Sequence, residues 1–240
     1  MINTQLETYK SFITHNLYYY QYFLYFFLYV RFLYSMTFFT LKKYNKFNNL
    51  DLYKQKYITK NIVKSFNLLI LTIFTPTILY PVFVYNTWNN HYIYICGFFY
   101  SSNDLAALTY IKKLPVNTRN HHMITTVLSI VSVNIDYNNS ILAKMLICYT
   151  LFSSLAFPVN TYLGVRYLYD KEKLVTFKKF TRNVYGVSLT LNWLYHITSI
   201  IYNFNLLGIS HYLYFFCLFW IIKDDIILMP AINFIASYNM

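Results

Sequence analysis

Long apolar runs separated by short polar connections constrain this chain more than any other feature of its sequence. Seven runs approach the length of about 20 residues that a helix needs to cross a bilayer, at residues 15–39, 66–88, 92–110, 121–137, 141–164, 184–203 and 206–222. Only 12% of the 240 residues are charged, whereas about 25% is usual in soluble domains. The sequence therefore predicts an all-α, polytopic transmembrane bundle with about seven spans.

Lys and Arg gather in every second connection between these runs. Residues 42–64 hold seven lysines, residues 111–120 hold three basic residues, and residues 166–182 hold six. The intervening connections, near residues 89–91, 136–139 and 203–208, carry no Lys or Arg and only Asp136 as a charged residue. By the positive-inside rule the basic connections face the compartment from which the chain inserts. We expect the N-terminus outside and the C-terminus inside.

The amino-acid composition indicates the compartment in which the protein is encoded, because it is rich in aromatic residues and implies an AT-rich coding sequence. Twenty-eight Tyr and 22 Phe accompany many Asn, Ile and Lys and only four Gly, which resembles proteins encoded in protist mitochondrial genomes. The first 20 residues have neither the charged start and cleavage site of a signal peptide nor the Arg-rich character of a transit peptide. We expect the mitochondrial inner membrane, with the basic connections in the matrix.

The formal charge of +12 raises the question of a nucleic-acid partner. Because the basic residues lie in a few connections between apolar runs, we expect no nucleic acid and instead an anionic phospholipid such as cardiolipin. The candidate lipid-binding residues are Lys112, Lys113, Arg119, Arg166, Lys178, Lys179 and Arg182.

Three parts are expected along the chain. Residues 1–65 give a first span followed by a basic amphipathic loop, residues 66–222 a six-helix bundle, and residues 223–240 a tail too short to span. This tail would return along the surface or pack on a neighbouring subunit. If the first span ends near Val30, Arg31 reaches the inner interface; if it continues through Thr40, Arg31 needs a partner within the membrane. We favour the interfacial position.

Asp104 and the adjacent pair His121 and His122 are the leading candidates for chemistry. A carboxylate within a span costs a few kcal/mol unless paired or hydrated, so Asp104 should face the bundle. Adjacent helical residues diverge by about 100°, so only one of the two histidines should point inward. Imidazole suits general acid–base catalysis. The alternative is structural, with one interfacial histidine and one histidine bonded to Asp104.

Other polar residues interrupt the later runs. Pro158 should kink the fifth run and free the carbonyl of Ser154, and Asn160 lies just beyond it. Asn192 and His196 are four residues apart and share a helix face. We expect Asn160 and His196, with Asp104 and one histidine of the pair, to line an internal polar cavity or to form helix–helix contacts.

Redox and metal centres are not indicated by the sequence. Cys96, Cys148 and Cys217 each stand alone in an apolar run, where a packing role is expected. Metal ligation by two adjacent histidines alone is not expected, because helical ligands are usually three or four residues apart. We expect no metal, haem or Fe–S cluster.

The stretch "NDLAALTYIKKLPVNTRNHHMITTVLSI" resembles the TLC (TRAM/LAG1/CLN8) family of membrane proteins: an Asp in one span, a short basic loop, then His-His and Thr opening the next. "LFSSLAFPVNTYLGVRYL" is similar to a segment of its TLC-domain-only branch. The resemblance covers roughly residues 66–222 and implies that His121 and His122 correspond to the acyl-transfer pair of ceramide synthases. Those enzymes carry further carboxylates in the helix after the pair, where this chain has "ILAKMLICYTLF".

Three functions follow from these patterns. The favoured one is a non-catalytic accessory subunit of a mitochondrial respiratory complex or supercomplex, with cytochrome oxidase or bc1 preferred, that contacts other membrane subunits and lipid. The alternative is a TLC-type lipid acyltransferase or lipid-remodelling enzyme using His121, His122 and Asp104. The second alternative is an ATP synthase membrane subunit or a proton-conducting subunit that uses Asp104 and His196.

Overall fold

The computed structural model describes the backbone of residues 2–133, 137–138 and 140–234, and side chains within residues 17–227 of this part. Its regular structure is all helical: α1 (Ile2–Leu41), α2 (Asn45–Asn48), α3 (Leu52–Tyr85), α4 (Asn90–Tyr110), α5 (Val116–Ser132), α6 (Ile141–Ser154), α7 (Phe157–Val165), α8 (Lys171–Tyr202), η1 (Phe204–Leu206) and α9 (Ile209–Phe234). The predicted all-α class is confirmed for the described residues. Asp136 and residues 235–240 of the predicted tail lie outside them.

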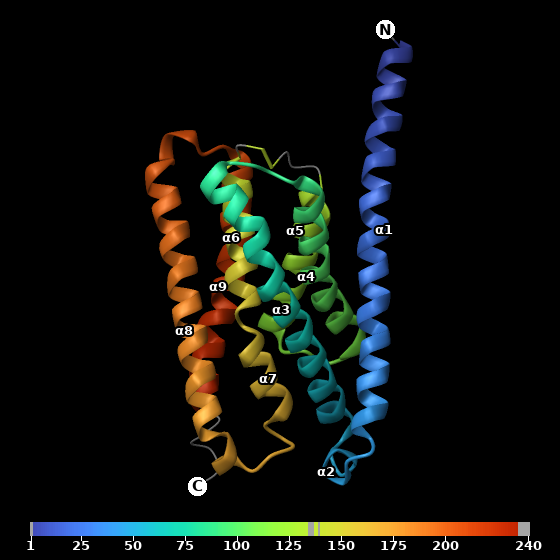
Figure 1. The fold of residues 1–240 in the computed structure, drawn as a ribbon, viewed down its shortest axis with the longest axis vertical. Helices are drawn as coiled ribbons and strands as arrows, with labels where there is room; N and C mark the ends of the chain where they lie inside the picture. The colour runs from blue at the N-terminus through green and yellow to red at the C-terminus, as the bar shows by residue number, and fades with distance from the viewer. Residues whose placement is uncertain (1, 134–136, 139, 235–240) are drawn as a thin grey trace.

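Successive long helices run in alternating directions and form one bundle (Figure 1). Helix α1 flanks the bundle and packs on α3 and α4, while α3 packs closely on α7, α4 on α5, and α6 on α8. The connections 42–51 and 166–170 lie at one end (the lower end in Figure 1), and the connections 86–89 and 203–208 lie at the other. We refer to the end that holds residues 42–51 and 166–170 as the basic end.

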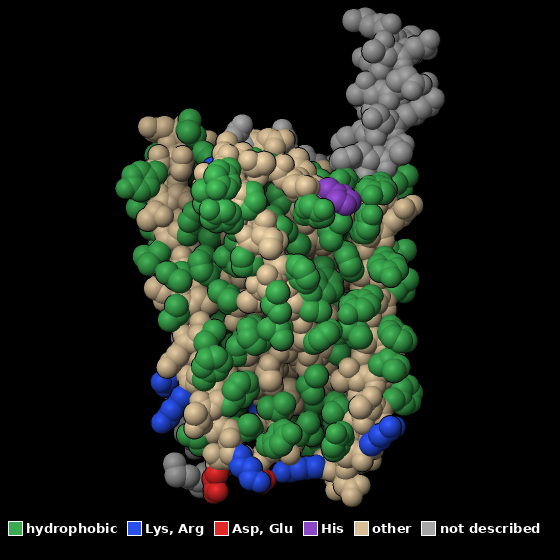
Figure 2. Space-filling model, in the orientation of Figure 1, with side chains coloured by type: hydrophobic (Ala, Val, Ile, Leu, Met, Phe, Trp, Pro, Cys, Tyr) green, Lys and Arg blue, Asp and Glu red, His purple; other side chains and the backbone are tan. Residues whose placement is uncertain are grey.

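An apolar exterior covers much of the height of the bundle. Within the described residues, three helical segments are long and apolar enough to cross a membrane: Leu17–Leu41, Leu52–Tyr85 and Ile141–Val165. Figure 2 shows one face, where hydrophobic side chains extend over most of the helices and Lys and Arg gather near the basic end. A continuous apolar exterior of this size is typical of a protein surrounded by lipid.

Helices α3 and α8 begin well before the apolar runs from which we predicted them. The Asp51 side chain caps α3 by accepting a hydrogen bond from the Lys54 amide at 2.9 Å. The predicted basic loop therefore shrinks to residues 42–51, and α3 continues through the boundary placed at residue 65. Helix α8 starts at Lys171 rather than at residue 184. The high lysine content of these two segments led us to predict loops. Lysine is a good helix former, so both helices begin within the lysine-rich segments.

Helix α1 does not end at Val30, since its helical hydrogen bonding continues to Leu41. Arg31 lies beside the last turn of α4, where its Nη1 donates to Thr109 Oγ1 at 3.5 Å and its guanidinium stacks 5.3 Å from the ring centre of Tyr110. The interfacial position of Arg31 stays a prediction, because the helix bounds do not place the membrane surface along α1. Arg31 has polar and aromatic partners on α4 that accommodate a charge on a continuous helix.

The predicted interruption at Pro158 is present. Helix α6 ends at Ser154 and α7 begins at Phe157, with Pro158 in the first turn, where its missing N–H costs no helical bond. Ser188 Oγ of α8 donates to the freed carbonyl of Phe152 at 2.6 Å, and Asn160 Nδ2 donates to the Ala156 carbonyl at 3.2 Å. The Ser188 hydroxyl thus satisfies a backbone group that the break releases, whereas the Ala156 carbonyl also accepts hydrogen bonds from the backbone N–H groups of Val159 and Asn160.

The last helix is longer than predicted. Helix α9 continues through Lys223, Asp224 and Asp225 to Phe234, so the predicted tail begins inside a helix rather than returning along the surface. It packs on α5, α6 and α8. This packing carries its two aspartates to the start of α5.

Candidate functional site

Asp104 is the centre of a buried polar cluster. Its side chain is fully buried, as expected, and it receives three contacts from two helices: Lys64 Nζ of α3 at 2.6 Å, Thr125 Oγ1 of α5 at 2.6 Å, and His122 Nδ1 of α5 at 2.9 Å. Lys64 is itself 8% exposed. A buried carboxylate persists when it is paired and hydrogen-bonded in this way. The cluster fixes α3, α4 and α5 relative to one another.

Both histidines of the pair are buried, which contradicts the expectation that only one faces the bundle. His121 is 9% exposed and His122 is 3% exposed. The two rings diverge as adjacent helical residues must, with ring planes 84° apart. Because α5 packs between α4 and α9, each ring meets a different carboxylate: His122 meets Asp104, and His121 Nδ1 lies 3.3 Å from Asp224 Oδ2.

Asp224 and Asp225 are site residues that the sequence reasoning missed. Asp224 also accepts a hydrogen bond from Thr118 Oγ1 at 3.3 Å, and Asp225 accepts one from Tyr185 Oη of α8 at 2.7 Å. A signal was available: two adjacent acidic residues follow an apolar run after a single lysine, in a chain with only eight acidic residues. They bring two carboxylates from α9 to the residues around α5 and α8.

A cavity of about 330 Å³ opens beside this cluster, within the range of about 300–1,000 Å³ usual for ligand pockets. Both histidines, Asp224 and Asp225 form one wall. The other polar side chains that line it come from α3, α6, α7 and α8 and include Lys60, Asn61, Lys64, Ser153, Asn160, Arg166, Tyr185, Ser188 and Asn192. The cavity therefore joins acidic, basic and imidazole groups in one enclosed space.

The predicted set of polar residues only partly shares this cavity. Asn160 and Asn192 line it, together with both histidines. Asp104 is not among the lining residues and contacts His122, which is. His196 does not line the cavity either. Its Nε2 lies 2.9 Å from Tyr214 Oη, and its Nδ1 lies 2.8 Å from the Asn192 carbonyl oxygen. His196 thus joins α8 to α9 and has the partner that its buried position requires.

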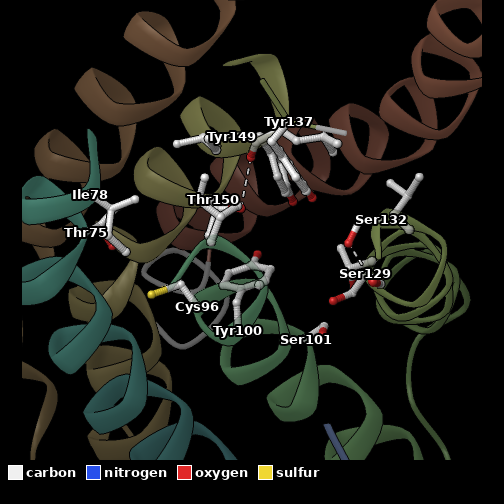
Figure 3. A pocket seen from close by; sticks show the side chains of 16 residues that line it. Thr75, Ile78, Cys96, Tyr100, Ser101, Ser129, Ser132, Tyr137, Tyr149 and Thr150 are labelled. Atoms are coloured by element: carbon white, nitrogen blue, oxygen red, sulfur yellow. Dashed lines mark hydrogen bonds between the residues drawn. The ribbon is translucent and has the colours of Figure 1, made fainter. Parts of the chain in front are cut away.

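A second, smaller cavity of about 80 Å³ lies further from the basic end, among α3, α4, α5 and α6. Figure 3 shows hydroxyl groups of Thr, Ser and Tyr residues around it, among them Tyr100 and Tyr149. The same two tyrosines line the larger cavity, with ring centres 6.4 Å apart in an edge-to-face contact. These two tyrosines are therefore shared by the linings of both cavities.

Three side chains of the cluster have suitable atoms for a metal ion. The donor atoms of Asp104, His121 and His122 lie within 4.8 Å of one another. However, the Lys64 ammonium already lies 2.6 Å from Asp104 Oδ1 and Thr125 donates to Oδ2. A cationic group bonded to the carboxylate competes with a metal ion for the same oxygens, so the geometry favours proton chemistry.

The predicted lipid-binding residues are mostly separate from the cavity. Lys112, Lys113, Arg119, Lys179 and Arg182 are exposed, and Lys178 is half-buried. Arg166 alone among the predicted set lines the cavity. The cysteines are free within the described residues, with Cys148 buried and Cys96 and Cys217 half-buried.

Comparison of the chain with family models, curated proteins and solved structures found no match.

Proposed function

We propose that the protein is a membrane-embedded lipid enzyme that transfers or remodels an acyl group by acid–base catalysis at His121 and His122. One observation carries this proposal: two imidazoles, each beside a carboxylate from a different helix, line the same cavity. A carboxylate beside one ring nitrogen orients the ring and stabilises its protonated form. The other nitrogen then accepts a proton from a substrate hydroxyl or amine.

The proposed reaction is acyl transfer from a thioester to an amine or hydroxyl of a lipid. An imidazole removes the proton from the attacking group as its bond to the acyl carbon forms. The thiolate then leaves and receives a proton from the imidazolium, so no proton is lost or gained. Asp104 and Asp224 act as positioning residues. The resemblance of this segment to the TLC family supports the same class of reaction.

The proposed setting is a bilayer crossed about seven times, with the basic end on the matrix side of the mitochondrial inner membrane. The alternation of basic and uncharged connections and the apolar exterior support this orientation. It places the cavity toward the side on which a soluble acyl donor would be present.

The experiment is reconstitution of the full chain in liposomes with acyl-CoA and a mixture of amine- and hydroxyl-bearing lipids, followed by mass spectrometry of the products. Replacing either histidine of the pair by Gln should lower turnover at least 100-fold, since general catalysis contributes roughly 10²–10⁴. His91→Gln is the matched control, because His91 lies at the start of α4, at the opposite end. Equal turnover in all variants contradicts the proposal.

The second candidate is the accessory subunit of a respiratory complex. It is favoured by the outer face of α1, where Leu24, Tyr25, Leu28, Phe32 and Phe39 are each at least 57% exposed. Such a face suits lipid or a neighbouring transmembrane helix. Co-migration with a respiratory complex on a native gel in mild detergent, with no lipid product from the reconstituted chain, would favour this candidate over the enzyme.

A further inference from the structure

Lys60 is a buried cation for which the described residues provide no carboxylate. It lies on α3 one turn before Lys64 and is 5% exposed. Lys64 has Asp104 as its partner, whereas among the described residues no carboxylate oxygen lies within 4.0 Å of the Lys60 ammonium. Its contact is the ring of Tyr57, 5.4 Å from Nζ. An ammonium buried without a counter-ion is costly, so this position calls for an anion.

Arg166 is a second cation with unused donors on the same side of the cavity. Its Nη2 donates to Tyr167 Oη at 2.8 Å, but Nε and Nη1 are buried and form no hydrogen bond. The guanidinium lies 5.5 Å from the ring centre of Tyr57, the same ring that Lys60 contacts. Two cations with free donors therefore lie around one aromatic ring on the cavity wall.

The chemistry of the missing anion follows from these donors. Each unbonded N–H donor of the guanidinium can bond one oxygen of a phosphate, and the ammonium supplies a point charge to another oxygen. Both side chains line the cavity that holds the histidines. The carboxylates among the lining residues, Asp224 and Asp225, have His121, Thr118 and Tyr185 as partners, so neither forms an ion pair with Lys60 or Arg166.

We propose that Lys60 and Arg166 form a phosphate subsite, so that the substrate of this cavity carries a phosphate group. This inference deepens the proposed function, because it names the class of molecule that the histidines meet. The phosphate belongs either to the headgroup of a phospholipid or to a soluble nucleotide-type acyl carrier. In both cases it lies on the α3–α7 side of the cavity and directs the rest of the molecule toward α5.

The test is a binding measurement on the purified full chain in uncharged detergent. Three probes separate the sources: phosphatidylglycerol, diacylglycerol with the same chains, and adenosine 3′,5′-bisphosphate. Lys60→Met and Arg166→Met should each weaken binding of a phosphate-bearing probe at least tenfold, since hydrogen bonds to charged groups are worth about that factor. Lys43→Met is the matched control, since Lys43 is exposed in the 42–51 connection.

The outcomes decide the proposal and its source. If the Lys60→Met and Arg166→Met variants lose binding of phosphatidylglycerol alone, the phosphate belongs to a lipid headgroup. If they lose binding of the bisphosphate alone, it belongs to a soluble carrier. Unchanged binding in both variants, an equal loss in Lys43→Met, or equal binding of diacylglycerol would overturn the subsite. Lys60→Met should also unfold at no lower temperature than the wild type, because it removes an uncompensated charge; a large fall would make Lys60 a structural cation and overturn the proposal.

Because binding and turnover are measured separately, failure of the phosphate subsite can be distinguished from failure of the acyl-transfer proposal. The His121→Gln and His122→Gln variants should retain phosphate-dependent binding while losing turnover. If no variant or wild-type protein shows turnover but binding still depends on Lys60 and Arg166, the subsite stands and the acyl-transfer proposal fails.

Discussion

Replacing Lys64 by Met tests whether the charge cluster around Asp104 holds the bundle together. The ammonium and the carboxylate are 2.6 Å apart, with side-chain exposures of 10% and 0%. At an effective dielectric constant of about 20, their direct attraction is roughly 6 kcal/mol. Removing one partner of a buried pair usually costs about 3–5 kcal/mol, because the other charge stays buried. Since His122 and Thr125 still contact Asp104, we expect about 3 kcal/mol.

The assay is thermal unfolding of the purified chain in detergent, followed by circular dichroism. A loss of about 3 kcal/mol corresponds to a fall in Tm of roughly 6–12 °C for a chain of this size. Lys60→Met is the matched control: the same substitution one turn away on α3 removes a cation that has no carboxylate partner among the described residues, and should not lower Tm.

A double-mutant cycle separates pairing from packing. Asp104→Asn leaves the Lys64 ammonium without a carboxylate, and Lys64→Met leaves Asp104 with only His122 and Thr125 as partners, whereas the double variant removes both charges. The double variant should be less destabilised than the sum of the singles by at least about 1 kcal/mol. If the stability losses of the two single variants add up to that of the double variant, the reasoning that this pair is coupled is refuted. A decrease in Tm of less than about 2 °C for Lys64→Met would refute it as well.

Three further predictions concern packing and membrane insertion. Gly164→Ala should cost about 1–3 kcal/mol in thermal unfolding, because a Cβ there would lie 2.8 Å from Cγ1 of Ile62 and 3.3 Å from its amide nitrogen; an unchanged Tm would refute the close packing of α3 on α7. Tyr214→Phe removes the hydroxyl 2.9 Å from His196 Nε2 and should cost about 1–2 kcal/mol, a loss absent if the contact is not formed. Ile73→Lys, on an outward position that is 63% exposed, should disfavour membrane insertion by about 2.5–3.5 kcal/mol in a glycosylation-based insertion assay. Insertion equal to that of Ile73→Leu would show that α3 does not face lipid there.

The helical class could be predicted because apolar run length and the position of basic residues are local properties of the chain. The break at Pro158 was equally local, since a proline cannot complete a helical bond with the preceding turn. The helix starts at Leu52 and Lys171 were missed for the opposite reason. Their first turns are rich in lysine and other polar residues, so hydropathy alone does not separate them from loops.

The proximity of Asp104 to the histidine pair was within reach of the sequence. Helices α4 and α5 are joined by a short connection, so residues near the end of one lie at the depth of residues near the start of the next. Which histidine ring faces which carboxylate could not be predicted from the sequence. That depends on α5 having neighbours on both sides, and a single sequence specifies the apolar faces of a helix without naming the helices that cover them.

The sequence by itself determined that this chain forms apolar helices with a basic end, and that an aspartate and two histidines lie near that end. Only the tertiary structure brought Lys64 of α3, Asp104 of α4, the histidines of α5 and Asp224 of α9 into one cluster. The physical reason is that covalent spacing and hydropathy act along one helix, while a site made from several helices depends on their rotation and order of packing. Those are fixed by contacts between residues 40 or more positions apart, such as the Lys64–Asp104 pair.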